Sequence, residues 1–175
     1  MVTGTGNITE LASQALRPGL GIFSAKIQPA RHGFAVQIEL DGLTHPLGSV
    51  TVGECEEYSV RLTACIDEAV RANNPAIPVG LTEENYTLEV SSAGAERELR
   101  LPQELDRFLG PPIKVLYKNV EGKLETAVVV CQGKQEDGSY AFETYVSRRR
   151  KGKGKPKTLK LMTTEIQKAN LFLDF

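Results

Sequence analysis

Residues 86–97 read Tyr-Thr-Leu-Glu-Val-Ser-Ser-Ala-Gly-Ala-Glu-Arg. Tyr86, Leu88 and Val90 occupy every second position, which predicts a strand with one buried face. The small residues that follow allow a sharp bend, and Gly94 accepts the positive φ that other residues resist. We therefore expect a strand to end at a corner here, with a new segment beginning at the charged residues beyond it.

The region before this strand has the pattern of a helix followed by two strands. Apolar residues recur at helical spacing over 8–16, with Asn7 in the capping position and Pro18-Gly19 beyond the end. Two alternating runs follow at 20–28 and 34–40. Because their connection is short, they are expected to form an antiparallel hairpin.

A second helix is expected to begin after Thr51. Thr51 and Glu54 have the spacing of a capping box, in which each side chain satisfies a backbone amide of the other residue. Asn73-Asn74-Pro75 would end this helix. The resulting order is helix, strand, strand, helix, strand. Two helices on one face of a three-stranded sheet is the most economical arrangement of these elements.

Past the corner, the chain changes to short alternating runs. The expected strands are 113–117, 124–131, 140–146, 158–161 and 171–175. Five short strands favour a small barrel of the SH3 or Sm kind, because closure removes exposed strand edges. The predicted fold class is α+β. Residues 1–93 would form an N-terminal α/β domain, and residues 94–175 a C-terminal SH3/Sm-like small β-barrel.

One segment carries the positive charge of the C-terminal region. Residues 1–100 hold 7 Lys and Arg against 13 Asp and Glu, whereas residues 101–175 hold 14 against 9. Eight of those basic residues fall within 148–160, where no acidic residue occurs. Such a run can displace counterions from a phosphate backbone, and its self-repulsion favours a polyanionic partner over a merely solvated hairpin tip. The candidate RNA-binding or partner-binding residues of the run are Arg148, Arg149, Arg150, Lys151, Lys153, Lys155 and Lys157.

Charged residues also gather just after the corner. Arg97 and Arg100 are further candidates for contact with RNA or a protein partner. For Glu96 and Arg97, an ion-pair network that holds the two domains together explains the residues as well as a partner contact does.

Two separated segments resemble the bacterial ribosome maturation factor RimP family. The corner after Val90 is similar to that family's Val-Ser-Ser-Pro-Gly-like corner leading into an Arg, with Ala93 where the family usually has proline. Residues 166–175, Ile-Gln-Lys-Ala-Asn-Leu-Phe-Leu-Asp-Phe, resemble its closing Ile-x-Lys-Ala-Asn-Leu segment. Arg107 lies in a segment that resembles the family's Arg-Phe-x-Gly element, and we expect it to help seat the segment that closes the barrel.

The resemblance implies a function and a set of partners. It implies an α/β domain followed by an SH3/Sm-like barrel. It also implies a non-enzymatic, cytoplasmic factor that binds the immature small (30S) ribosomal subunit and assists its late assembly. The implied partners are the ribosomal RNA of that subunit and a small-subunit ribosomal protein near the decoding centre.

Other classes of function have less support. No apolar run approaches the length of a membrane span. Cys55, Cys65 and Cys131 lack the close pairs of zinc sites and are expected to be reduced structural thiols. Ser91 and Ser92 do not lie in a Gly-x-Ser-x-Gly elbow, and a serine at a tight corner usually bonds its own backbone. We therefore expect no enzymatic activity, no cofactor and no metal.

One alternative stays open on the sequence alone. The protein could be a free-standing Sm-like RNA-binding module that is not tied to the ribosome. Proteins of the Sm type usually work as rings, so this alternative predicts a stable oligomer, whereas the ribosome-bound factor is expected to be a monomer.

Overall fold

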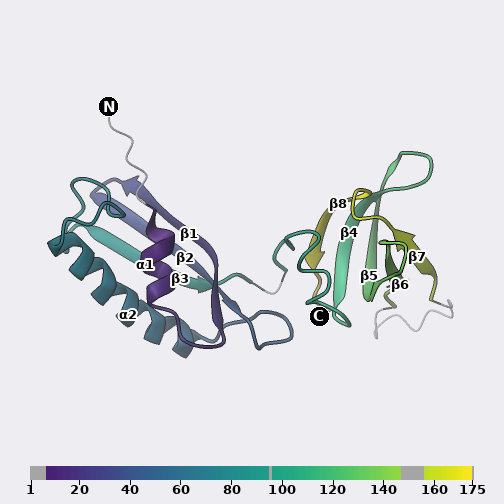
Figure 1. The fold of residues 1–175 in the computed structure, drawn as a ribbon, viewed down its shortest axis with the longest axis horizontal. Coiled ribbons are helices and arrows are strands. Elements are labelled where there is room, and N and C mark those ends of the chain that lie inside the picture. The colour runs from purple at the N-terminus through teal and green to yellow at the C-terminus, as the bar shows by residue number, and fades with distance from the viewer. Residues whose placement is uncertain (1–6, 95, 147–155, 175) are drawn as a thin grey trace. The chain divides into compact units, whose positions relative to one another are not determined.

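The computed structural model describes residues 7–94, 96–146 and 156–174 of the chain (Figure 1). Contacts divide the chain into two compact units, Met1–Gly94 and Ala95–Phe175. The described residues form two helices, a three-stranded sheet and a five-stranded sheet. The α+β class predicted from the sequence is confirmed.

The N-terminal unit is built on a three-stranded sheet with β2 in the centre. Its strands are β1 (Leu20–Ala30), β2 (Gly33–Gly42) and β3 (Tyr86–Ser92). The hairpin prediction is confirmed, since β1 and β2 pair antiparallel across a two-residue turn at Arg31 and His32. β2 and β3 pair parallel, which requires the long crossover connection that contains the second helix.

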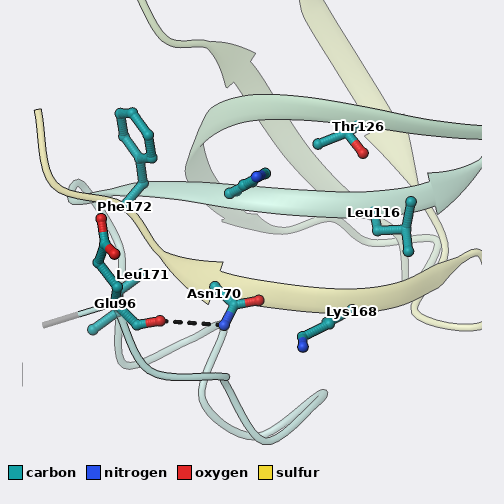
Figure 2. Close-up of a pocket in the computed structure, with 8 residues that line it drawn as sticks. Glu96, Leu116, Thr126, Lys168, Asn170, Leu171 and Phe172 are labelled. Atoms are coloured by element: carbon teal, nitrogen blue, oxygen red, sulfur yellow. Dashed lines mark hydrogen bonds between the residues drawn. The ribbon is translucent and has the colours of Figure 1, made fainter. Parts of the chain in front are cut away.

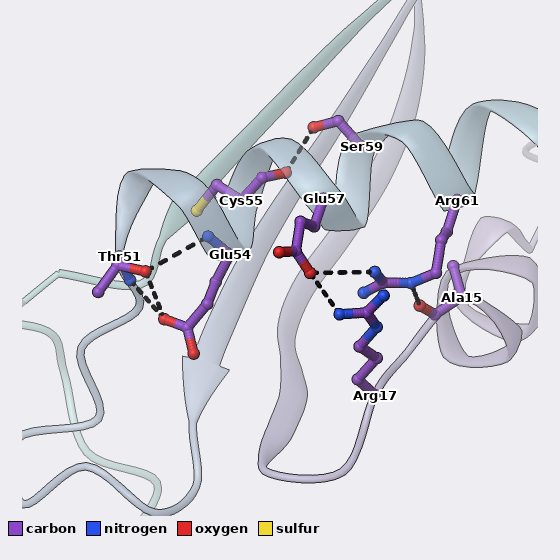
Figure 3. A network of polar contacts seen from close by, with 8 residues as sticks. All are labelled: Ala15, Arg17, Thr51, Glu54, Cys55, Glu57, Ser59 and Arg61. Atoms are coloured by element: carbon purple, nitrogen blue, oxygen red, sulfur yellow. Dashed lines mark hydrogen bonds and ion pairs between the residues drawn. The ribbon is translucent and has the colours of Figure 1, made fainter.

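Two helices, α1 (Ile8–Gln14) and α2 (Val52–Arg71), cover one face of this sheet (Figure 1). The predicted caps are confirmed. The Asn7 side chain accepts a hydrogen bond from the backbone N–H of Thr9 at 3.3 Å. At the start of α2, the Thr51 hydroxyl accepts from the N–H of Glu54 at 3.3 Å, and the Glu54 carboxylate accepts from the N–H of Thr51 at 2.8 Å (Figure 3). Two orphan amides are thereby satisfied.

Polar contacts also tie the two helices together. The Arg61 side chain of α2 donates to the carbonyl of Ala15 at the end of α1, at 2.8 Å (Figure 3). The Glu57 carboxylate pairs with Arg17 just beyond α1. Inside, the Tyr58 hydroxyl donates to the carbonyl of Ala12 at 2.8 Å. Burial raises the pKa of Tyr58, so this hydroxyl stays a donor.

The core of the N-terminal unit lies between the helices and the sheet. Alternate β2 residues point into it, as the period of two requires. The residues of this core that are at most 1 % exposed include Val36, Ile38, Leu40, Tyr58, Leu62 and Ile66. Polar Gln37 and Glu89 lie on the other face, where their side chains hydrogen-bond at 3.0 Å.

The C-terminal unit contains a five-stranded antiparallel sheet in the order β7-β6-β5-β4-β8. The strands are β4 (Pro112–Lys118), β5 (Leu124–Lys134), β6 (Tyr140–Thr144), β7 (Thr158–Leu161) and β8 (Ile166–Leu171). Phe108 and Phe142, each at most 1 % exposed, are the largest side chains of its core that are less than 2 % exposed. Register shifts bend the sheet locally, one in β5 between Cys131 and Gly133 and one in β8 opposite Leu116 and Tyr117.

The predicted barrel is not confirmed. No ladder joins β7 to β8 in the part of the chain that the structure describes, so the sheet is open. The physical reason lies at the outer edge of β8, which another segment occupies. Leu171 donates to the carbonyl of Arg97 at 3.0 Å, and Leu99 donates to the carbonyl of Ala169 at 2.8 Å. Residues 97–99 thus cover the edge that closure by β7 would use.

The prediction for the last strand was wrong in position. A strand was expected at 171–175, but β8 spans Ile166–Leu171 and residues 172–174 form no strand. Ile166, Ala169 and Leu171 are the buried residues of β8. The register shift opposite Leu116 and Tyr117 breaks the period of two, and that period was the signal on which the prediction depended.

We expect the substitution Thr51→Ala to lower the free energy of unfolding by about 1 kcal/mol, because it removes the acceptor for the Glu54 amide. Urea unfolding followed by circular dichroism measures the change. Thr51→Ser retains the capping oxygen and should stay close to the wild-type stability. An equal loss in both variants would show that the capping box does not stabilise α2.

Candidate nucleic-acid interface

In the chain, the basic run follows β6 and extends into β7. Most of its candidate residues (Arg148, Arg149, Arg150, Lys151, Lys153 and Lys155) lie outside the described residues. Lys157 is described and exposed. Its backbone N–H donates to the Thr144 hydroxyl at 2.8 Å, and its carbonyl accepts from the N–H of Thr144 at 2.9 Å. This pairing holds Thr144 and Lys157 together at the edge of the sheet.

Arg97 is buried rather than presented at the surface. Its side chain is 1 % exposed, and its guanidinium lies 2.7 Å from the Glu104 carboxylate. The same guanidinium lies 5.3 Å from the centre of the Phe108 ring, within cation–π range. These contacts all belong to the C-terminal unit. The sequence left open an ion-pair network between the domains or a contact with a partner. The geometry supports an ion pair for Arg97, but its partner is Glu104 and the pair lies within one unit.

Glu104 also connects Arg100 and Arg107 to this cluster. Its second carboxylate oxygen accepts from the backbone N–H of Arg100 at 2.7 Å. The Arg107 guanidinium lies 3.8 Å from the Glu104 carboxylate and 4.8 Å from the centre of the Phe108 ring. The short segment 100–108 is thus organised around one carboxylate. Arg100 itself is exposed, in contrast to Arg97.

The corner after β3 is held by hydrogen bonds. Gly94 has a φ of 85°, as the sequence predicted. The Ser92 hydroxyl accepts from the backbone N–H of Val50 at 3.2 Å and of Gly94 at 3.5 Å, and Ala93 donates to the carbonyl of Leu40 at 2.8 Å. The Ser92 oxygen is therefore used for structure, in the way that is typical of a serine at a tight turn.

A surface that sequence reasoning missed lies on the outer face of β4, β5 and β8. It is a shallow hollow of about 450 Å³ (Figure 2). The residues that line it include Lys114, Leu116, Thr126, Lys168, Asn170 and Phe172, together with Glu96 at one side. Alternation within β4 could have placed Lys114 and Leu116 on one face. The cross-strand neighbours could not be read from the sequence, because β8 pairs with β4 across some fifty residues of chain.

Comparison with known proteins identifies the family. No family model matches the chain. The chain is 34% identical, over 174 residues, to the ribosome maturation factor RimP of Leptospira biflexa serovar Patoc. It is 30% identical, over 178 residues, to the ribosome maturation factor RimP of Leptospira interrogans. Both alignments cover 99% of this chain and 99% of the relative. The chain belongs to the RimP family. The resemblance seen at the corner and at the C-terminus is thereby confirmed, and as a RimP family member the protein is a ribosome maturation factor.

His45 and the three cysteines of this RimP family member were also candidates for chemistry, and their contacts are as follows. His45 Nδ1 accepts from the backbone N–H of Leu47 at 3.2 Å and of Ser49 at 3.3 Å. The three cysteines are free thiols, and burial raises the pKa of Cys131 and of Cys55, which keeps them protonated. In residues 7–94, 96–146 and 156–174, no group of three or more His, Cys, Asp and Glu could hold a metal ion. Within the same ranges, no helix has the length and apolarity needed to cross a membrane.

We expect Arg97→Ala to lower the free energy of unfolding by about 3 kcal/mol, because it leaves the Glu104 carboxylate without its closest cation and opens space beside Phe108. Arg31→Ala makes the same chemical change in the exposed turn between β1 and β2, and should cost no more than about 0.5 kcal/mol. Urea unfolding of both variants tests the difference. Equal stability of the two variants would contradict a structural role for Arg97.

Proposed function

We propose that this protein binds the immature small (30S) ribosomal subunit and assists its late assembly. The observation that carries the proposal is the similarity to RimP proteins along the whole chain, which is not restricted to one domain. The protein acts without catalysis, as a cytoplasmic monomer that binds and then leaves the maturing particle. Its partners are the ribosomal RNA of the small subunit and a small-subunit ribosomal protein near the decoding centre.

The charge distribution supports a division of labour between the two domains. Residues 1–100 carry a net charge of −6 and residues 101–175 carry +5, from the counts given above. The acidic N-terminal domain, residues 1–93, suits a basic ribosomal protein. The C-terminal domain, residues 94–175, suits RNA through its basic run. We propose that the C-terminal domain is related to the SH3/Sm-like barrels, with its described strands forming an open sheet.

Sucrose gradients of extracts from growing cells test the proposal. We expect the protein to sediment with the small-subunit fractions, and we expect its removal to leave small-subunit RNA incompletely processed. A protein that stays at the top of the gradient, in cells whose RNA processing is normal without it, would contradict the proposed function. A stable ring-like oligomer in light scattering, together with binding of small RNAs alone, would instead support the free-standing Sm-like module.

The basic run gives a second test. If about four of its side chains contact phosphates, log affinity for the immature subunit should fall with log salt concentration with a slope of about −3 to −4. Replacement of Arg148, Arg149, Arg150 and Lys151 by glutamine should remove most of that slope. None of the four replaced side chains is apolar, so the stability of the protein should change by no more than about 0.5 kcal/mol.

Binding to purified immature subunits at several salt concentrations measures this slope. The control is Lys26→Gln, which removes one exposed lysine from β1 in the N-terminal unit and should leave the slope unchanged. A quadruple variant with the wild-type slope would exclude these four residues from the RNA contact.

A further inference from the structure

The outer face of the C-terminal sheet presents three adjacent strands without a covering element among the described residues. In β4, Ile113, Val115 and Tyr117 point into the core, so Lys114, Leu116 and Lys118 point outward. The register places Leu116 between Thr126 on β5 and Lys168 on β8, and it places Lys114 opposite Asn170. Side chains from segments far apart in the sequence therefore form one continuous surface, the outer face (Figure 2).

The outer face carries more positive than negative charge, and its carboxylates lie at one margin, beside β8. Lys114 and Lys118 are exposed and have no ion pair with any described residue. Lys168 lies 3.0 Å from the Glu98 carboxylate, and both side chains are about half exposed, so this pair is weak. Glu96 and Glu98 lie on the segment beside β8, at one margin. On β5 the outward neighbours of the lysines are uncharged, Leu124, Thr126 and Val128.

Two apolar side chains, Phe172 and Leu116, also line this surface. Phe172 lies at one end, where its backbone N–H donates to the carbonyl of Pro112 at 3.0 Å, and Leu116 lies further along β4 (Figure 2). The rise of a strand puts about 13 Å between those two points of β4. The Phe172 ring is half-buried, with the Tyr145 ring edge-on to it at 6.4 Å between centres. A half-buried aromatic ring that a neighbour holds in place is a preformed surface for another flat group.

We infer that the outer face binds single-stranded RNA, with bases against Phe172 and Leu116 and phosphates at Lys114, Lys118 and Lys168. Cations interleaved with an aromatic ring are the combination that proteins use for unpaired nucleic acid, since every base has a face that can stack and every nucleotide a phosphate. An acidic peptide would use the lysines but would leave the ring without a matching flat group. This inference rests on the proposed role at the immature subunit, and the site includes no residue of the basic run.

Binding of the full chain to a fluorescent, unstructured RNA of about twelve nucleotides tests the inference by anisotropy. We expect Phe172→Ala to lower affinity about tenfold through loss of a stacked base. Lys114→Gln should make the slope of log affinity against log salt less negative by about 0.7, the value for one phosphate contact on a single strand. The matched control is Lys134→Gln, which removes an exposed lysine at the end of β5, outside the hollow, and should leave slope and affinity unchanged.

Crosslinking identifies the residues that contact the RNA, which a change in affinity caused by loss of charge does not do. The same RNA carrying thiouridine should crosslink to residues 112–118 and 166–172 of the wild-type protein, and Phe172→Ala should weaken those crosslinks. Circular dichroism confirms that each variant is folded. Crosslinks restricted to 148–157, wild-type affinity in both variants, or no measurable binding by the wild-type protein would each overturn the inference.

Binding to immature subunits is measured in parallel, so that the two proposals fail separately. If Lys114→Gln weakens subunit binding but not RNA binding, the outer face contacts a protein and the inference is overturned. If the variants affect RNA binding as expected and the protein never sediments with subunits, the proposed function fails and the RNA site stands.

Discussion

The Arg97 guanidinium lies buried beside the Glu104 carboxylate and over the Phe108 ring, and the C-terminal unit is organised around that contact. A buried cation is costly unless it is paired, and the segment 100–108 folds back against Arg97 to supply that partner. At the same place, the backbone of 97–99 pairs with the outer edge of β8. The chain that leaves the corner is therefore joined to the sheet through both its side chains and its backbone.

This arrangement explains why the sheet is open. A strand edge can accept only one neighbour, and residues 97–99 already occupy the free edge of β8. β7 has only four residues, and they pair with β6. The pairing of β6 with β7 also holds Thr144 and Lys157 together at the other edge of the sheet. One topology thus supports both proposed RNA contacts on the C-terminal unit.

The parts of the fold that could be predicted are those with a local physical cause. The capping box at Thr51 and Glu54 needs only residues three apart, and the corner at Gly94 needs only a residue without a Cβ. The last strand was misplaced because an extra residue in β8, opposite Leu116 and Tyr117, breaks its alternation. Of the features of the candidate site, the charge of the basic run is visible in the sequence, whereas the burial of Arg97 depends on Glu104 and Phe108, which fold back onto it.

The sequence by itself determined the α+β class, most of the helices and strands, the segregation of charge and the membership of the family. Each of these follows from spacing, composition or motif, which are properties of neighbouring residues. The tertiary structure alone decided which arginine is buried, which edge of β8 is covered, and that Lys114, Lys168 and Phe172 share one surface. These depend on pairing between segments far apart in the chain, and the free energy of such pairing comes from burial and hydrogen bonds that exist only once both segments are in place.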